Sequence, residues 1–212
     1  IKEIISENDI YYKFTHQKIR EYVYNLQSAG KKKLLHKKVS DYLEKNLNNN
    51  NNDKFLYPNL IYHFERCGNT KKAVQYKIKN LSEYYSFFHE TFPVVFDNTF
   101  KIQLEDNIIN VEEKLLEIEK QLISVQDESY EFNILKMELS YLFGRYYIHI
   151  GEYSSGLEKI DISMRLAETI RYEQYLLNNY KQMIYYGIQV HNMVTMNKYI
   201  NKSLNIIEKM DS

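Results

Sequence analysis

Apolar residues recur at spacings of three and four along most of the chain, which is the period of one helix face. Polar residues fill the positions between them, as expected of helices that bury one side and expose the other. The pattern is clearest in one run: Ile108, Val111, Leu115, Ile118, Leu122 and Val125. It predicts an amphipathic helix that spans too few heptads to indicate a coiled coil.

Start and stop signals place further helices in the first half of the chain. Thr15 is expected to cap a helix to about Leu26, and Leu34 to Leu43 form the apolar face of the next. Pro58 suits a first helical turn and Gly68-Asn69 suits a helix end, so a helix should lie between them. Thr70 is expected to cap the helix that follows.

The last third of the chain predicts two helical hairpins. The first joins Tyr130–Ile150 to Tyr153–Ile170, and the second joins Tyr172–Val190 to Met193–Met210. Connections this short force neighbouring helices to run antiparallel.

Three segments depart from the helical pattern. Ile4 to Phe14 has two apolar runs around a polar turn, which predicts a short N-terminal β-hairpin. Residues 48–56 include five consecutive asparagines that cannot bury apolar area, and this stretch should be a flexible surface loop. Residues 89–104 are too apolar for a free linker and should pack on the scaffold, although their role stays open.

Small and bulky residues between 140 and 170 match the tetratricopeptide pattern, in which small residues let paired helices approach and large ones fill the gaps. The small positions are Gly144, Gly156 and Ser163, and the bulky positions are Tyr147, Tyr153 and Ile160. Two residues depart from the pattern, because Ser140 stands at the Trp position and Glu168 stands where proline often ends the repeat.

A weaker match around Met193 to Ser203 aligns Ser203 with Ser163, which makes the local period 40 residues. The usual period is 34, and longer helices account for the difference. We therefore expect an all-α fold in which residues 57–212 form a tetratricopeptide-like right-handed superhelix of antiparallel helix pairs. Residues 1–47 would be the end of a separate domain with its connecting helices.

Composition narrows the classes of function. Lys plus Arg and Asp plus Glu both number 28, so the net charge attracts neither nucleic acid nor an anionic membrane. The one cysteine cannot form an internal disulfide, and no charged-then-apolar stretch or long apolar run suggests secretion or membrane insertion. The cytoplasm is the expected compartment. Twenty-one tyrosines suit thin helical layers with many half-buried positions.

The N-terminal third resembles the signal-transduction ATPases with numerous domains, at the join between their winged-helix and repeat domains. The resemblance covers about residues 1–81 and rests on Phe14-Thr15-His16-x2-Ile19-Arg20, Lys33-x2-His36-x2-Val39 and Leu60-x2-His63-x4-Gly68. It implies that residues 1–14 are the last hairpin of a winged helix, that an ATPase module lies upstream, and that the whole protein is a bacterial transcriptional activator or a related regulator.

In that family, Thr15-His16-Gln17 looks like the Met-His-Asp motif, whose histidine can face the phosphates of bound ADP. The resemblance implies that His16 senses the nucleotide state in the whole protein. Only the histidine matches the motif. The alternative is that His16 is a structural residue of the capping turn, packed against the next helices.

The residues offer no catalytic or metal-binding constellation. No G-x-x-x-x-G-K-[ST] sequence occurs, and His89-Glu90 is followed by Pro93 where a zinc-protease helix would need its second histidine. The remaining histidines show no paired spacing and Cys67 has no companion, so each is expected to be a packed or surface residue. No cofactor or metal is expected, and an enzyme is disfavoured.

Two residue groups are candidate contacts for a partner. Four tyrosines could line the concave groove of a superhelix and stack on a peptide, although core packing is the simpler interpretation. They are Tyr146, Tyr147, Tyr185 and Tyr186. A lysine cluster could contact an acidic partner, or it could be a solvated helix face. Its members are Lys31, Lys32, Lys33, Lys37 and Lys38.

These patterns predict a scaffold of a larger regulator that binds a protein, a peptide or a small inducer and transmits its occupancy to the ATPase. The alternative is a passive adaptor that docks a protein without nucleotide coupling.

Overall fold

A computed structural model describes residues 5–8, 11–14, 16–48, 50, 52–86, 111–125, 127 and 129–210. Among these residues every element after Phe14 is helical, which confirms the predicted all-α class. The expected apolar segment 89–104 lies outside the described residues. Contacts divide the chain into two compact units, Ile1–Ala73 and Val74–Ser212, and each is described separately.

The first unit begins with two short strands, β1 (Ile5–Asn8) and β2 (Tyr11–Phe14), which pair antiparallel with Ile5 opposite Phe14. The helices that follow are α1 (Gln17–Asn25), α2 (Ala29–Lys45), the 3₁₀ helix η1 (Asp53–Leu56) and α3 (Tyr57–Cys67). Helix α2 packs against α3. Leu60 and Phe64 of α3 are almost fully buried, since they share one helix face at a spacing of four.

The helix ends in this unit follow the expected chemistry, with two corrections. Gly68 ends α3 in the left-handed conformation, as predicted from its missing side chain. The residue before α1 is His16 rather than Thr15, and its side chain makes no capping hydrogen bond. Helix α4 (Thr70–Ser86) is capped by Asn69, whose Oδ1 accepts from the Lys72 backbone N–H at 3.2 Å, so Thr70 is already helical.

The asparagine-rich stretch contains more structure than its composition predicts. Asp53 is buried at the start of η1, and its carboxylate accepts from the backbone N–H groups of Asn48 and Asn50. These hydrogen bonds fix Asn48 and Asn50 relative to Asp53.

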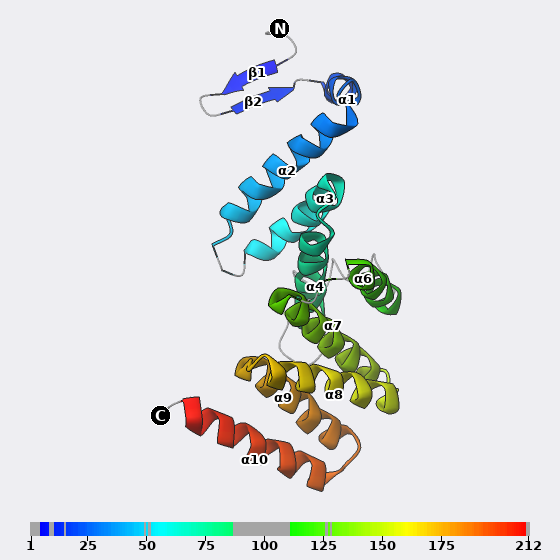
Figure 1. Ribbon diagram of the computed structural model, residues 1–212, viewed down its shortest axis with the longest axis vertical. Helices are drawn as coiled ribbons and strands as arrows, with labels where there is room; N and C mark the ends of the chain where they lie inside the picture. Colours follow the sequence, from blue (N-terminus) through cyan, green and yellow to red (C-terminus); the bar gives the residue numbers. More distant parts are fainter. Residues whose placement is uncertain are drawn as a thin grey trace, which may run out of the picture. The chain divides into compact units, whose positions relative to one another are not determined.

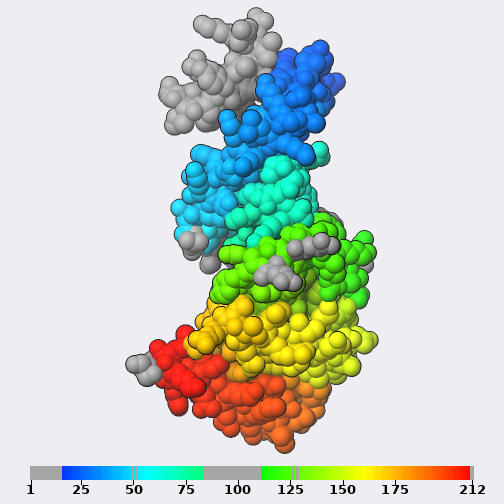
Figure 2. Space-filling model, viewed as in Figure 1, coloured from blue at the N-terminus to red at the C-terminus, as the bar shows by residue number. Residues whose placement is uncertain are grey.

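The second unit contains α4 from Val74 onward, α6 (Val111–Val125), α7 (Tyr130–His149), α8 (Tyr153–Thr169), α9 (Glu173–Gln189) and α10 (Met193–Met210). Consecutive helices from α7 to α10 pack against one another, and the figures show α8, α9 and α10 in close succession (Figures 1 and 2). The first and last residues of α7, α8, α9 and α10 agree with those of the two predicted hairpins to within one residue.

Helix α7 belongs to two hydrophobic clusters. On one side Leu135, Leu142 and Phe143 pack with buried residues of α4 and α6. On the other side Met137 and Ile148 pack with buried residues of α8, α9 and α10. A helix that is apolar all round is buried from several directions, so α7 is the centre of this unit.

Helices α7 and α8 cross at two glycines. A Cβ atom on Gly144 would lie 2.5 Å from Cγ1 of Ile160, and one on Gly156 would lie 2.9 Å from the Ile148 backbone nitrogen. Both distances are below contact range, so only glycine permits this approach. The small positions predicted for the pair are confirmed at Gly144 and Gly156. Ser163 is also fully buried, and Asn179 of α9 donates to its hydroxyl.

The loops after α7, α8 and α9 repeat one geometry. Gly151, Arg171 and His191 each have positive φ angles, 87°, 56° and 53°, and they follow one another at intervals of 20 residues. The last residues of α7 and α9 are 40 residues apart, as are the first residues of α8 and α10. The predicted period of 40 residues therefore holds for these two helix pairs.

This loop geometry predicts the effect of glycine at two positions. A left-handed backbone costs an ordinary residue about 1–2 kcal/mol, and glycine avoids this cost. Glycine also loses more conformational entropy on folding, which offsets part of the gain. Arg171→Gly and His191→Gly should each stabilise the protein by about 0.5–1 kcal/mol in denaturant unfolding. Gly151→Ala is the opposite control and should destabilise it. Equal stability of all three variants would contradict the assigned loop geometry.

Candidate functional site

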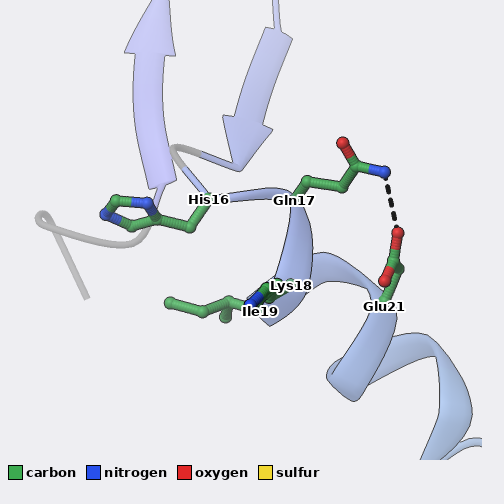
Figure 3. Close-up of a pocket in the computed structure, with 5 residues that line it drawn as sticks. All are labelled: His16, Gln17, Lys18, Ile19 and Glu21. Carbon is green, nitrogen blue, oxygen red and sulfur yellow. Dashed lines mark hydrogen bonds between the residues drawn. The ribbon is translucent and has the colours of Figure 1, made fainter.

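His16 lies beside a shallow recess at the start of α1. The recess has a volume of about 650 Å³ and is lined by His16, Gln17, Lys18, Ile19 and Glu21, which all come from one short stretch (Figure 3). His16 is exposed, and the Gln17 amide donates to Glu21 Oε1 at 2.8 Å on another side of the helix. The alternative that His16 packs against the next helices is not what the described residues show. Nucleotide sensing by His16 stays a prediction.

The four candidate tyrosines divide between the two hydrophobic clusters of the second unit. Tyr146 and Tyr147 are half-buried against the α4–α6–α7 cluster, and the Tyr147 hydroxyl donates to Glu112 of α6 at 3.2 Å. Burial, and then the charge of Glu112, raises the pKa of both phenols. Tyr185 and Tyr186 pack instead with the α7–α10 cluster, where Tyr186 lies against Tyr153. The structure therefore places these residues in inter-helix packing and does not gather them on one face.

A groove of about 530 Å³ lies between α6, α7 and α8. Its sides are mainly apolar, and four charged side chains and one serine also face it. Its volume is within the range of ligand pockets, which combine apolar walls with a few polar groups. The lining residues are Glu119, Leu122, Ile123, Asp127, Phe132, Lys136, Leu139, Ser140, Lys159, Ile162 and Leu166.

The charges of the groove are unequally compensated. Lys159 forms an ion pair with Glu119 at 2.8 Å and lies over the Phe143 ring. Asp127 accepts from the backbone N–H and the hydroxyl of Ser129. Lys136 is exposed and lies 4.6 Å from the Phe132 ring centre, and it pairs with no carboxylate of a described residue. Two carboxylates and two lysines therefore face the groove, and of the two lysines only Lys136 has no ion-pair partner among the described residues.

Ser140 explains why the groove is open. The sequence pattern expects a bulky residue at this position, and the structure shows a serine that lines the groove. A serine side chain leaves unfilled the volume that an aromatic ring would occupy. The departure from the repeat pattern thus marks the candidate site.

A polar cluster joins α7 to α9, and the sequence analysis did not identify it. Burial raises the pKa of Glu138, while a hydrogen bond from Tyr175 and the charge of Lys79 oppose that rise. Burial and the neighbouring Glu138 raise the pKa of Tyr175, which also lies edge-on to Tyr141. Such shifts occur in structural networks as well as in catalytic sites. We interpret this cluster as the contact that holds α7 against α9.

Two histidines also approach each other unexpectedly. His36 of α2 and His63 of α3 share a hydrogen bond between their Nδ1 atoms at 2.8 Å, and the Tyr24 hydroxyl lies 2.8 Å from Nε2 of His36. The two residues are 27 positions apart, so no sequence spacing could reveal the pair. Both residues pack between helices, as one of the two predicted alternatives has it.

The remaining candidate groups are solvent-facing. Four lysines of the cluster on α2 are exposed, and Lys32 lies over the Tyr24 ring at 4.8 Å. Among the residues that the structure describes, no three metal-ligating side chains gather at one point. His89 and Glu90 lie outside those residues.

No helix in the described part of the chain is both long and apolar enough to span a membrane. Searches against family models, curated proteins and solved structures found no match for this chain.

Proposed function

We propose that the second unit is a tetratricopeptide-like scaffold that binds a segment of another protein in the groove between α6, α7 and α8. The observation that carries this proposal is the groove itself, which combines an apolar lining with a lysine that has no ion-pair partner among the described residues. The repeated helix pairs support it, since stacked repeats present extended surfaces to partners. A right-handed superhelical arrangement of these pairs belongs to the same proposal.

The resemblance of residues 1–81 to signal-transduction ATPases supports a wider role. On this basis the chain is part of a cytoplasmic multidomain regulator, of the transcriptional-activator type, whose scaffold reports occupancy to an ATPase module. His16 would then respond to the nucleotide held by that module. A passive adaptor without nucleotide coupling is the second candidate, and peptide titrations with and without the ATPase module would separate the two.

Peptide selection tests the binding proposal. Peptides from a displayed library should bind the chain, and calorimetry should show at least tenfold weaker binding to Ile123→Glu and Lys136→Glu. Ile123 is 70% exposed and Lys136 is exposed as well, so neither change should disturb folding.

Leu204→Glu on α10 is the matched control, because Leu204 is 50% exposed and does not line the groove. The affinity of this variant for the selected peptides should equal that of the unchanged protein. Failure to select any peptide, or equal affinity in all variants, would overturn the proposal.

A further inference from the structure

The next repeat shows what fills the equivalent groove. At the period of 40 residues, Ser140 corresponds to Tyr180 and Lys159 corresponds to Tyr199. These tyrosines are only 6% and 8% exposed, and their ring centres lie 5.4 Å apart. Two aromatic rings therefore occupy, between α9 and α10, the positions that serine and lysine hold between α7 and α8.

Lysines lie over aromatic rings in both repeats, although they stand at different positions, since Lys202 aligns with Ile162 at the period of 40 residues. Lys202 of α10 lies over the rings of both Tyr180 and Tyr199. In the open groove, Lys136 and Lys159 lie over the rings of Phe132 and Phe143. Cations near aromatic rings attract further π-faces, and an aliphatic side chain would not gain this interaction.

Charge specifies the neighbour of the aromatic group. Lys159 pairs with Glu119, and Asp127 accepts hydrogen bonds from Ser129 that do not cancel its charge, so Lys136 carries the one positive charge of the groove without an ion-pair partner among the described residues. A carboxylate close to the inserted ring would complement that charge.

The geometry points to a partner segment that inserts an aromatic side chain, next to an acidic residue, into the groove at Ser140. This inference rests on the proposed function and names the chemistry of its ligand. The partner's ring would complete the repeat in the way that Tyr180 completes the next one.

Two probes test the chemistry directly: the N-acetylated dipeptide amides Tyr-Asp and Leu-Asp, titrated onto methyl-labelled protein. The tyrosyl probe should shift the methyl signals of Leu122, Ile123 and Leu139 in a saturable way. The leucyl probe should bind at least fivefold more weakly. Saturation on other helices, or equal affinity of the two probes, would overturn the inference.

A variant that fills the groove provides a second measurement. Ser140→Tyr should abolish the tyrosyl-probe shifts and raise the melting temperature by about 3–8 °C, because the new ring is buried. Ser154→Tyr, on an exposed position of α8, should change neither. Retained probe binding in Ser140→Tyr would contradict the inference, and the methyl-shift titration stands even if that variant does not fold.

The outcomes separate this inference from the proposed function. If library peptides bind at the groove but the probes do not differ, the aromatic specificity is wrong and the scaffold remains. If neither peptides nor probes bind, both fail.

Discussion

Gly156→Leu is expected to destabilise the protein by about 3 kcal/mol or more, which is a large part of the stability of a typical domain. The first added atom alone would lie 2.7 Å from Ile148 Cγ1 and 2.9 Å from the Ile148 backbone nitrogen. The Ile148 side chain could rotate away, but the Ile148 backbone cannot move without separating α7 from α8. Urea unfolding followed by circular dichroism measures this effect.

Gly156→Ala should also be destabilising, although alanine favours a helix interior by up to about 1 kcal/mol. Its methyl group meets the same backbone nitrogen, so the steric cost outweighs the propensity. Gly30→Leu is the matched control, because Gly30 is also helical and has no atom within 4 Å of an added Cβ. If Gly156→Leu were as stable as Gly30→Leu, the α7–α8 crossing and the repeat register would both be wrong.

The first unit should lose stability as the pH falls below about 6.5, the ordinary histidine pKa. Burial lowers the pKa of His36, and the charge of Arg66 lowers it further. Burial and then the charge of His36 lower the pKa of His63. The unfolded chain therefore binds more protons than the folded chain in this pH range, and acid favours unfolding.

The lowered pKa values of the two histidines set the direction of this change. The pair is fully stabilising above pH 6.5, where both imidazoles are neutral, and the stabilisation decreases as the pH falls toward their lowered pKa values. Denaturant unfolding at pH 7.5 and pH 5.0 should show the loss. Histidine NMR titrations should place the pKa values of both residues below 6.5.

Variants separate the pair from other titrating groups. His63→Asn keeps a polar group near the position of Nδ1 but does not titrate there, so it should reduce the dependence of stability on pH. His149→Asn, at an exposed position of α7, is the control and should retain the full dependence. A pH dependence that is the same in His63→Asn and in the unchanged protein would show that the histidine pair is not its source.

Part of the candidate site was visible in the sequence. Ser140 was identified as a departure from the repeat pattern, and the structure places it in the groove. The sequence could not show that Ser140 lines a groove, because the other walls of the groove come from α6 and α8 and their packing against α7 is set by the tertiary structure. The tyrosine pairs 146–147 and 185–186 show the converse, since the sequence left open both a shared groove surface and core packing, and the structure packs them against two different cores.

Local chemistry in the sequence determined the helices themselves. Apolar spacing of three and four defined α6, and the short links between α7 and α10 defined antiparallel pairs, because both effects act over a few residues. The positions of Gly144 and Gly156 at a helix crossing were also predictable, since closely packed helices require small residues where they meet. Tertiary structure alone decided the His36–His63 contact, the burial of Asn179 against Ser163 and the groove. Each joins side chains from different helices, and their separation in space depends on how whole helices pack rather than on any local spacing.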